Sequence, residues 1–211
     1  MVQKRQYTLV RQEQIVDAAR KLIIKYGSEH VTVRRIANQV GISEAAIYRH
    51  FKSKRDILSL LVDNIENDFL ADFATVNTHG PSLLEVLGSM LKSHLSAVER
   101  RRGISFQVIA EIISLGDKKL NRRVSGIINK YMSSLKGLLC EGIGTGEVRE
   151  DIDPEATAVI IFGTIQGLVN IWALSNYSFD PQEKFEPLWR ILREGIIKRR
   201  TCTLSGVAGR C

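Results

Sequence analysis

Several side chains near the N-terminal end are of the types that contact double-stranded DNA. Glu44 can accept a hydrogen bond from the N4 amine of cytosine, and the methyl groups of Ala45 and Ala46 can contact thymine methyls. Arg34 can reach a guanine edge or a phosphate. Lys54 begins a helical pattern, where backbone N–H groups and the helix dipole already attract an anion. These residue types indicate base and phosphate contacts, provided that a rigid element presents them together.

The elements that would position these side chains are encoded between Thr32 and Phe51. Thr32 and Ser43 are good N-cap residues, and Gly41 allows the positive φ that ends one helix before another begins. The second helix is expected at residues 44–50, about 10 Å long, which fits the DNA major groove of roughly 12 Å. The pattern is therefore that of a helix-turn-helix with the second helix as reader. Its core residues are expected to be Ile36, Ala37, Ile42, Ile47 and Phe51.

The run T-V-R-R-I-A-N-Q-V-G-I-S-E-A-A-I-Y-R-H-F-K-S-K resembles the DNA-binding region of TetR-type transcriptional regulators. The resemblance implies base contacts from Arg34, Glu44, Ala45, Ala46 and Tyr48. It implies phosphate contacts from Thr32, Ser43, Tyr48, Arg49, His50 and Lys54. Many relatives carry a basic residue, Gly and Ser or Thr where this chain has E-A-A, so the operator sequence does not follow. For Tyr48 the alternative is a half-buried packing aromatic, and for His50 an ordinary surface or core histidine.

The charge distribution agrees with a DNA-binding N-terminal region. The net charge of the chain is +7, but residues 1–55 carry twelve Lys/Arg against four Asp/Glu, a balance of +8. The rest carries eighteen against nineteen, a balance of −1. A basic module on a nearly neutral body is the electrostatic pattern of a nucleic-acid-binding protein.

Beyond this region the chain predicts an all-α fold of about nine helices, because apolar residues recur at helical spacing and no stretch alternates as a strand does. A loose basic arm is expected at residues 1–10. Helices are expected at residues 11–26, 32–40, 44–50, 53–76, 82–101, 104–115, 117–142, 154–176 and 181–199. The expected domains are a helix-turn-helix domain at 8–68, with the motif itself at about 31–50, and an effector-binding and dimerisation domain at 69–200. A disordered tail is expected at 201–211.

The last two long helices carry the expected dimer interface. Gly163 and Gly167 form a GxxxG spacing in an apolar helix, which permits close helix approach inside the core or across a dimer. The resemblance implies a four-helix bundle with a second copy of the chain. The expected interface residues are Gly163, Gly167, Ile171, Leu188 and Leu192.

The body is also expected to hold a small-molecule effector. Few charges interrupt its helices, so the expected effector is hydrophobic or amphipathic. The candidate pocket residues, each of which could equally be core, are Phe69, Phe73, Leu87, Met90, Leu91, Phe106, Ile109, Ile113, Met132, Leu135 and Trp172.

An enzyme is not expected. The four histidines have no metal-ligand spacing, the three cysteines form no pair or metal motif, and no nucleophile or phosphate-loop motif is present. No cofactor and no metal are therefore expected, and the cysteine usage fits the cytoplasm. The apolar run at residues 158–174 contains Gln166 and Asn170 and is interpreted as a buried helix, so no membrane partner is expected.

These features predict a homodimeric repressor that is released from a near-palindromic DNA operator by a hydrophobic or amphipathic small molecule. The alternative is a DNA-bound scaffold that acts through a protein partner without an effector. A nucleoid-occlusion member of the same family has a similar V-G-x-S-E-A-A-x-Y-R-H-F segment.

Overall fold

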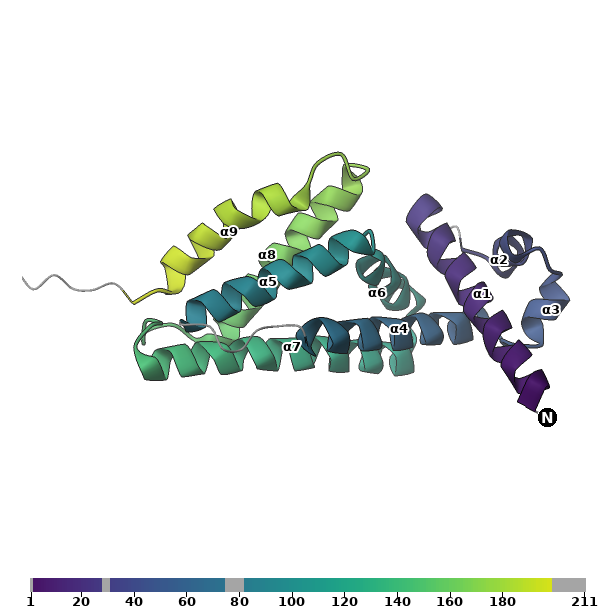
Figure 1. The fold of residues 1–211 in the computed structure, drawn as a ribbon, viewed down its shortest axis with the longest axis horizontal. Coiled ribbons are helices and arrows are strands. Elements are labelled where there is room, and N and C mark those ends of the chain that lie inside the picture. The colour runs from purple at the N-terminus through teal and green to yellow at the C-terminus, as the bar shows by residue number, and fades with distance from the viewer. Residues whose placement is uncertain (1, 28–30, 75–81, 199–211) are drawn as a thin grey trace, which may run out of the picture.

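The fold is entirely helical in the part of the chain that the structure describes. In a computed structural model, which describes residues 2–27, 31–74 and 82–198, these residues form nine α-helices and no strand (Figure 1). The helices are α1 Val2–Tyr26, α2 Val33–Val40, α3 Glu44–Tyr48, α4 Lys54–Ala74, α5 Leu83–Arg100, α6 Ile104–Leu115, α7 Lys118–Thr145, α8 Pro154–Leu174 and α9 Pro181–Ile196. The all-α prediction is thus confirmed, with α1–α3 at one end and the remaining helices extending away from them.

The helix boundaries differ from the predicted ones at two informative places. The expected loose arm at residues 1–10 is wrong, because α1 already begins at Val2. No Gly or Pro occurs between residues 1 and 26, so nothing in the sequence interrupts the helix there. The reader helix α3 is shorter than expected and ends at Tyr48. The expected tail at 201–211 lies outside the described residues.

Helix α4 leads from the N-terminal helices into the body, where it lies parallel to α7 (Figure 1). Arg123 of α7 donates to the Ser59 hydroxyl at 2.8 Å and forms an ion pair with Asp63 of α4. About two turns further along α7, Lys130 Nζ lies 2.9 Å from Glu66 Oε1. These polar contacts fix the register of the two helices and thereby the direction in which α4 carries the N-terminal module.

The buried residues form two clusters, and the division between them does not follow the order of the chain. The first cluster combines the interior of α1–α4 with three residues of α6, Ile104, Val108 and Ile112, and with the first half of α7. The second combines α5, the second half of α7, α8 and α9. Helix α6 therefore packs with the N-terminal module although it follows α5 in sequence.

Helix α8 is the one described helix long and apolar enough to cross a membrane by length and composition. It also supplies Ile161, Ile165 and Val169 to the second core cluster. This contribution is that of a core helix of the body.

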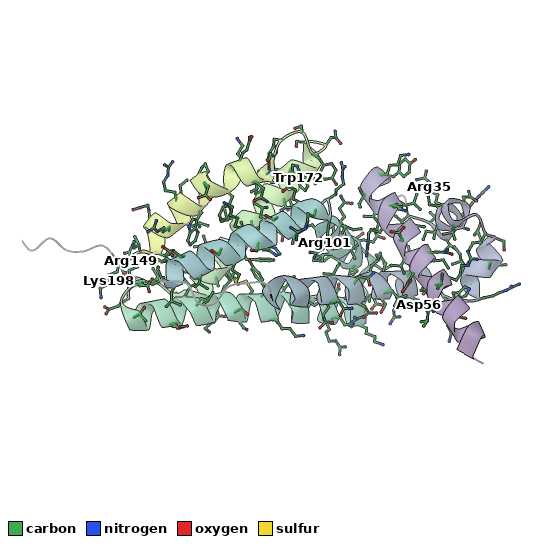
Figure 2. The ribbon with its side chains drawn as sticks, viewed as in Figure 1. Arg35, Asp56, Arg101, Arg149, Trp172 and Lys198 are labelled. Carbon is green, nitrogen blue, oxygen red and sulfur yellow. The ribbon has the colours of Figure 1, made fainter. Side chains whose placement is uncertain are left out.

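The end of the body far from the N-terminal module is closed by backbone hydrogen bonds. Figure 2 places Arg149 and Lys198 at the end far from Arg35 and Asp56. There the Arg149 backbone N–H donates to Ile196 O at 3.0 Å, and Lys198 N–H donates to Glu147 O at 2.9 Å. These bonds tie the chain after α9 to the turn after α7.

We expect Gly142→Ala to lower the free energy of unfolding by about 1–3 kcal/mol through overpacking. A Cβ on Gly142 would lie 2.5 Å from Val148 Cγ2, and both residues are buried. Gly144→Ala is the matched control, because that Cβ would meet nothing within 4 Å in the same helix. The control should be neutral or stabilising by up to about 1 kcal/mol. Denaturant unfolding of both variants measures the difference, and equal effects would contradict the close approach of α7 to Val148.

Candidate nucleic-acid interface and body cavity

The helix-turn-helix owes its shape to three local signals that the sequence contains. The Thr32 hydroxyl accepts from Arg35 N–H at 3.2 Å, and the Ser43 hydroxyl accepts from Ala46 N–H at 3.2 Å, so both predicted caps are confirmed. Gly41 has φ +74°, and the next amide, Ile42 N–H, donates to Ala37 O at 3.0 Å. Only a residue without a Cβ adopts this left-handed conformation at little cost, so the angle between α2 and α3 depends on Gly41.

One face of α3 is packed and the other is open. Ile47 is fully buried beneath the helix, in the same cluster as Ile36 and Phe51. The predicted base-reading residues lie away from that core: Arg34, Glu44 and Ala45 are exposed, Ala46 is half-buried, and Tyr48 is 52% exposed. The packed face holds the helix in place, and the open face presents these side chains to a partner.

The predicted phosphate-binding residues surround the same face. Thr32, Ser43 and Arg49 are exposed, and His50 is half-buried with a buried Nδ1 that has no hydrogen-bond partner among the described residues. The hydroxyl oxygens of Thr32 and Ser43 accept from helix N–H groups, which leaves each O–H available as a donor. This arrangement places hydrogen-bond donors on both sides of α3.

Lys54 is the one predicted phosphate ligand that the structure directs elsewhere. Its Nζ lies 2.7 Å from Glu111 Oε1 on α6, and both side chains are largely covered. The next residue, Arg55, places Nε 2.8 Å from Asp117 Oδ2 at the start of α7. The hydrogen bond from Leu120 N–H holds the pKa of Asp117 below its ordinary value, and the Arg55 and Lys119 charges act in the same direction. The first turn of α4 is thus joined to the body through two ion pairs.

The described part of the body contains one cavity with the composition of an effector site, and it is small, about 60 Å³. It lies among α4, α5, α6, α7 and α8, and Figure 2 shows Arg101 at the junction of α5 and α6. Its lining residues are Ile65, His94, Val98, Arg101, Ser105, Phe106, Ile109, Ile127, Ile128, Tyr131, Phe162 and Gln166. The walls are mostly aliphatic or aromatic, and the lining includes one guanidinium and no carboxylate.

Aromatic contacts order one wall of this cavity. The rings of His94 and Tyr131 lie 5.1 Å apart, and those of Tyr131 and Phe162 lie 5.6 Å apart. Burial raises the pKa of Tyr131 well above its ordinary value, so its phenol is neutral near pH 7. Among the lining residues, Arg101 is the one Lys, Arg, Asp or Glu side chain.

The structure brings only Phe106 and Ile109 of the predicted pocket residues to the cavity wall. The five that lie instead within the second core cluster are Leu87, Met90, Leu91, Leu135 and Trp172. Met132 packs against that cluster, and Ile113, one helical turn beyond Ile109 on the same side of α6, is not part of the cavity lining and is 66% exposed. Phe69 and Phe73 fall outside the residues whose side chains are described.

Sequence reasoning missed the polar part of the cavity lining. His94, Arg101, Ser105 and Gln166 lie on or beside otherwise apolar helices. The sequence signal that could have identified them is a polar residue at a position where helical spacing predicts a core side chain. For Gln166 it was used only as an argument against a membrane span.

Helices α8 and α9 present an apolar surface that the described residues leave uncovered. On α8 it includes Ile160, Ile171 and Leu174, between 59% and 85% exposed, and on α9 it includes Ile191, 69% exposed. A Cβ on Gly163 or Gly167 would meet nothing within 4 Å, so the GxxxG spacing serves no packing inside the described part of the chain. The two α9 residues predicted to lie in the dimer interface, Leu188 and Leu192, are half-buried against the second cluster.

Two family models match the chain and together cover most of it. One, described as bacterial regulatory proteins of the tetR family, matches residues 15–61. The other, described as the C-terminal region of YsiA-like proteins, matches residues 55–195. The first spans the helix-turn-helix and the second spans the body that contains the cavity.

Similar proteins include two kinds of regulator. A fatty acid metabolism regulator protein of Bacillus subtilis is 28% identical over 183 residues, 87% of this chain and 94% of that protein. The nucleoid occlusion factor SlmA of Vibrio vulnificus is 27% identical over 191 residues, 88% of this chain and 95% of that protein.

Solved structures extend the comparison to the whole fold. The Bacillus subtilis regulator FadR, solved in complex with stearoyl-CoA, has a TM-score of 0.69 at 28% identity, covering 87% of this chain and 98% of that one. The ketosteroid regulator KstR2 of Mycobacterium tuberculosis has a TM-score of 0.76 at 20% identity, covering 90% and 96%. The latter likeness concerns the fold alone.

Proposed function

The chain belongs to the TetR family of bacterial transcriptional regulators, and on that premise we propose that it is a homodimeric, cytoplasmic repressor released from its operator by an amphipathic acyl effector. The DNA-binding regulatory role belongs to the family. The repressor action, the dimer and the effector are the proposal. The proposed domains are residues 8–68 for DNA binding and 69–200 for effector binding and dimerisation.

The observation that carries the DNA-binding assignment is the open face of α3. A buried Ile47 fixes the helix while Glu44, Ala45 and Tyr48 are exposed on it. A recognition helix contacts base edges with its N-terminal residues and is anchored by phosphate contacts at its flanks. The arrangement supports base contacts from residues 44–46 and phosphate contacts from the surrounding hydroxyl and basic groups.

The uncovered apolar stripe on α8 and α9 supports a homodimer. Contiguous apolar side chains on a soluble protein mark an interaction surface. A two-fold dimer uses the same patch on both subunits, and it places two reader helices about 34–36 Å apart, one turn of DNA. The operator is accordingly expected to be near-palindromic.

The cavity composition and the similarity to an acyl-CoA-binding regulator support an acyl effector. The FadR relative is solved with stearoyl-CoA, and the cavity of this chain has an apolar wall with one guanidinium. Ligand pockets usually measure about 300–1,000 Å³, so a cavity of about 60 Å³ must expand to admit a long acyl chain. Binding therefore requires helices around the cavity to move.

Helix α6 is the element through which that movement would reach the DNA-binding module. Phe106 and Ile109 face the cavity, whereas Val108 and Ile112 are buried in the cluster that includes α1 and α4. A ligand that enters beside Phe106 displaces α6 toward the module, because interiors are too densely packed to absorb the change. A coupling of about 1–3 kcal/mol is enough for a useful switch.

A second function, a DNA-bound scaffold that acts through a protein partner, is favoured by a different observation. The nucleoid occlusion factor has nearly the same identity to this chain as the fatty acid regulator, and the cavity is small. DNA binding that does not respond to any acyl-CoA, together with specific retention of a protein partner, would favour this function over the first.

The test of the DNA-binding assignment is the Tyr48→Phe variant in a band-shift titration. We expect operator affinity to fall about tenfold, since one charge-assisted hydrogen bond to phosphate is lost in each subunit. The operator is a duplex selected from random sequence with the wild-type protein. Tyr26→Phe is the matched control, because Tyr26 is similarly exposed but lies at the end of α1. Unchanged affinity for Tyr48→Phe would assign Tyr48 to packing, and absence of any wild-type shift at low salt would reject the proposed function.

A further inference from the structure

The first turn of α4 has its positive charge neutralised by carboxylates from two other helices. Lys54 Nζ lies 2.7 Å from Glu111 Oε1, and Arg55 Nε lies 2.8 Å from Asp117 Oδ2. The side chains of Glu111 and Asp117 are each only 14% exposed, so these pairs are better shielded from solvent than the other ion pairs of the body. Both cationic side chains of this turn are therefore paired with carboxylates from other helices.

Two backbone N–H groups just before α4 are also occupied. Asp56 Oδ2 accepts from Lys52 N–H at 2.8 Å and from Ser53 N–H at 3.2 Å. Free N–H groups at a helix start attract anions, but these two already have a carboxylate. The Lys54 ammonium, which the family resemblance implies as a phosphate ligand, is paired with Glu111.

The position of Glu111 explains why the pair matters for DNA binding. Lys54 follows the end of α3 after one short turn, and Tyr48 is exposed at that end of α3. Glu111 lies on α6, two residues beyond Ile109 of the cavity wall and next to the buried Ile112. Its carboxylate reaches the DNA-binding module from the helix that also borders the cavity.

We propose that Glu111 is a positioning residue that competes with a DNA phosphate for the Lys54 ammonium and thereby limits the affinity of the protein for DNA. This inference rests on the proposed DNA-binding function. A phosphate oxygen and the Glu111 carboxylate are both anionic acceptors, and the partly covered carboxylate is already in place at hydrogen-bond distance. Binding DNA through Lys54 requires that this contact be exchanged for the phosphate contact.

The test uses full-length protein and a fluorescent random-sequence duplex of about 40 base pairs at low salt, because a phosphate contact is independent of sequence. We expect Glu111→Gln to tighten binding about threefold to tenfold, since the Glu111 carboxylate that competes with the phosphate is removed. In the Lys54→Met background the same substitution should change affinity by less than about twofold.

Two further variants separate competition from charge and from misfolding. Glu66→Gln removes one negative charge and one α4–α7 ion pair without touching Lys54, so it is expected to change affinity less than about twofold. Glu111→Asp keeps the charge but withdraws the carboxylate by one methylene, and should give part of the increase. Thermal melting of each variant verifies that it is folded.

The outcomes distinguish this inference from the proposed function. Weaker or unchanged binding by Glu111→Gln, an equal gain in the Lys54→Met background, or an equal gain from Glu66→Gln would overturn the competition while leaving DNA binding intact. A wild-type protein that binds no duplex would overturn both. Tighter binding by Glu111→Gln that disappears in the Lys54→Met background supports the competition and no other of these explanations.

Discussion

Replacement of both Ile171 and Ile191 by glutamate is expected to make the protein monomeric and to weaken operator binding by about 100-fold or more. These side chains are 61% and 69% exposed on adjacent helices, so the substitutions do not disturb the core of one chain. In a dimer the same positions would meet a second copy, and four buried carboxylates would leave uncompensated charge.

The expected loss of affinity comes from geometry more than from contacts with DNA. A dimer that has bound one half-site presents its second reader helix at an effective concentration in the millimolar range. A monomer loses that gain although α3 itself is unchanged. Sedimentation measures the oligomeric state, and a band-shift titration with the selected operator measures the affinity.

Ile113→Glu is the matched control for the dimer test. Ile113 is 66% exposed, as apolar as the interface residues, and lies on α6 away from the α8–α9 surface. The control should stay dimeric and bind the operator. A double variant that remains dimeric would show that the subunits associate through another surface.

The helix-turn-helix could be predicted from the sequence because its signals are local. Thr32 and Ser43 act within three residues of their own positions, and Gly41 ends α2 by its backbone conformation alone. Such features do not depend on which distant helix packs nearby. The arm at residues 1–10 was the local error, because a polar composition was taken to mean an unstructured terminus where no helix-breaking residue exists.

The cavity could not be predicted in the same way, because it depends on how several helices cross. Leu91 and Ile109 are both apolar residues at helical spacing, yet Leu91 is core and Ile109 faces the void. Helical periodicity gives the direction of a side chain from its own axis, but not which neighbour lies opposite. The same reason accounts for Lys54, whose partner Glu111 is 57 residues away.

The α8–α9 surface falls between these two cases. The GxxxG spacing points to a face of α8 that the described residues leave open, since a Cβ on Gly163 or Gly167 would meet nothing within 4 Å. It gave no information about α9, where the most exposed apolar residue is Ile191 and not Leu188 or Leu192. A wide apolar stripe does not reveal from sequence which of its residues the core will use.

Ile109→Trp is expected to preserve operator binding while raising the stearoyl-CoA concentration for half-release by about tenfold or more. Ile109 borders the cavity of about 60 Å³, and the additional ring would occupy most of that volume. The acyl chain would then have to displace the indole as well as the helices before it could enter.

The matched control is Ile113→Trp, four residues further along α6, where the side chain points to solvent. It should respond to stearoyl-CoA as the wild type does, because it adds the same group outside the cavity.

The measurement is release of the labelled operator during titration with stearoyl-CoA, with decanoyl-CoA as a shorter acyl probe. A wild-type protein that stays on DNA at saturating acyl-CoA would reject this effector class. Equal responses of Ile109→Trp and wild type would place the effector site elsewhere. If only Ile109→Trp is impaired, the effector acts by entering the cavity that Ile109 borders, since that is the volume the indole removes.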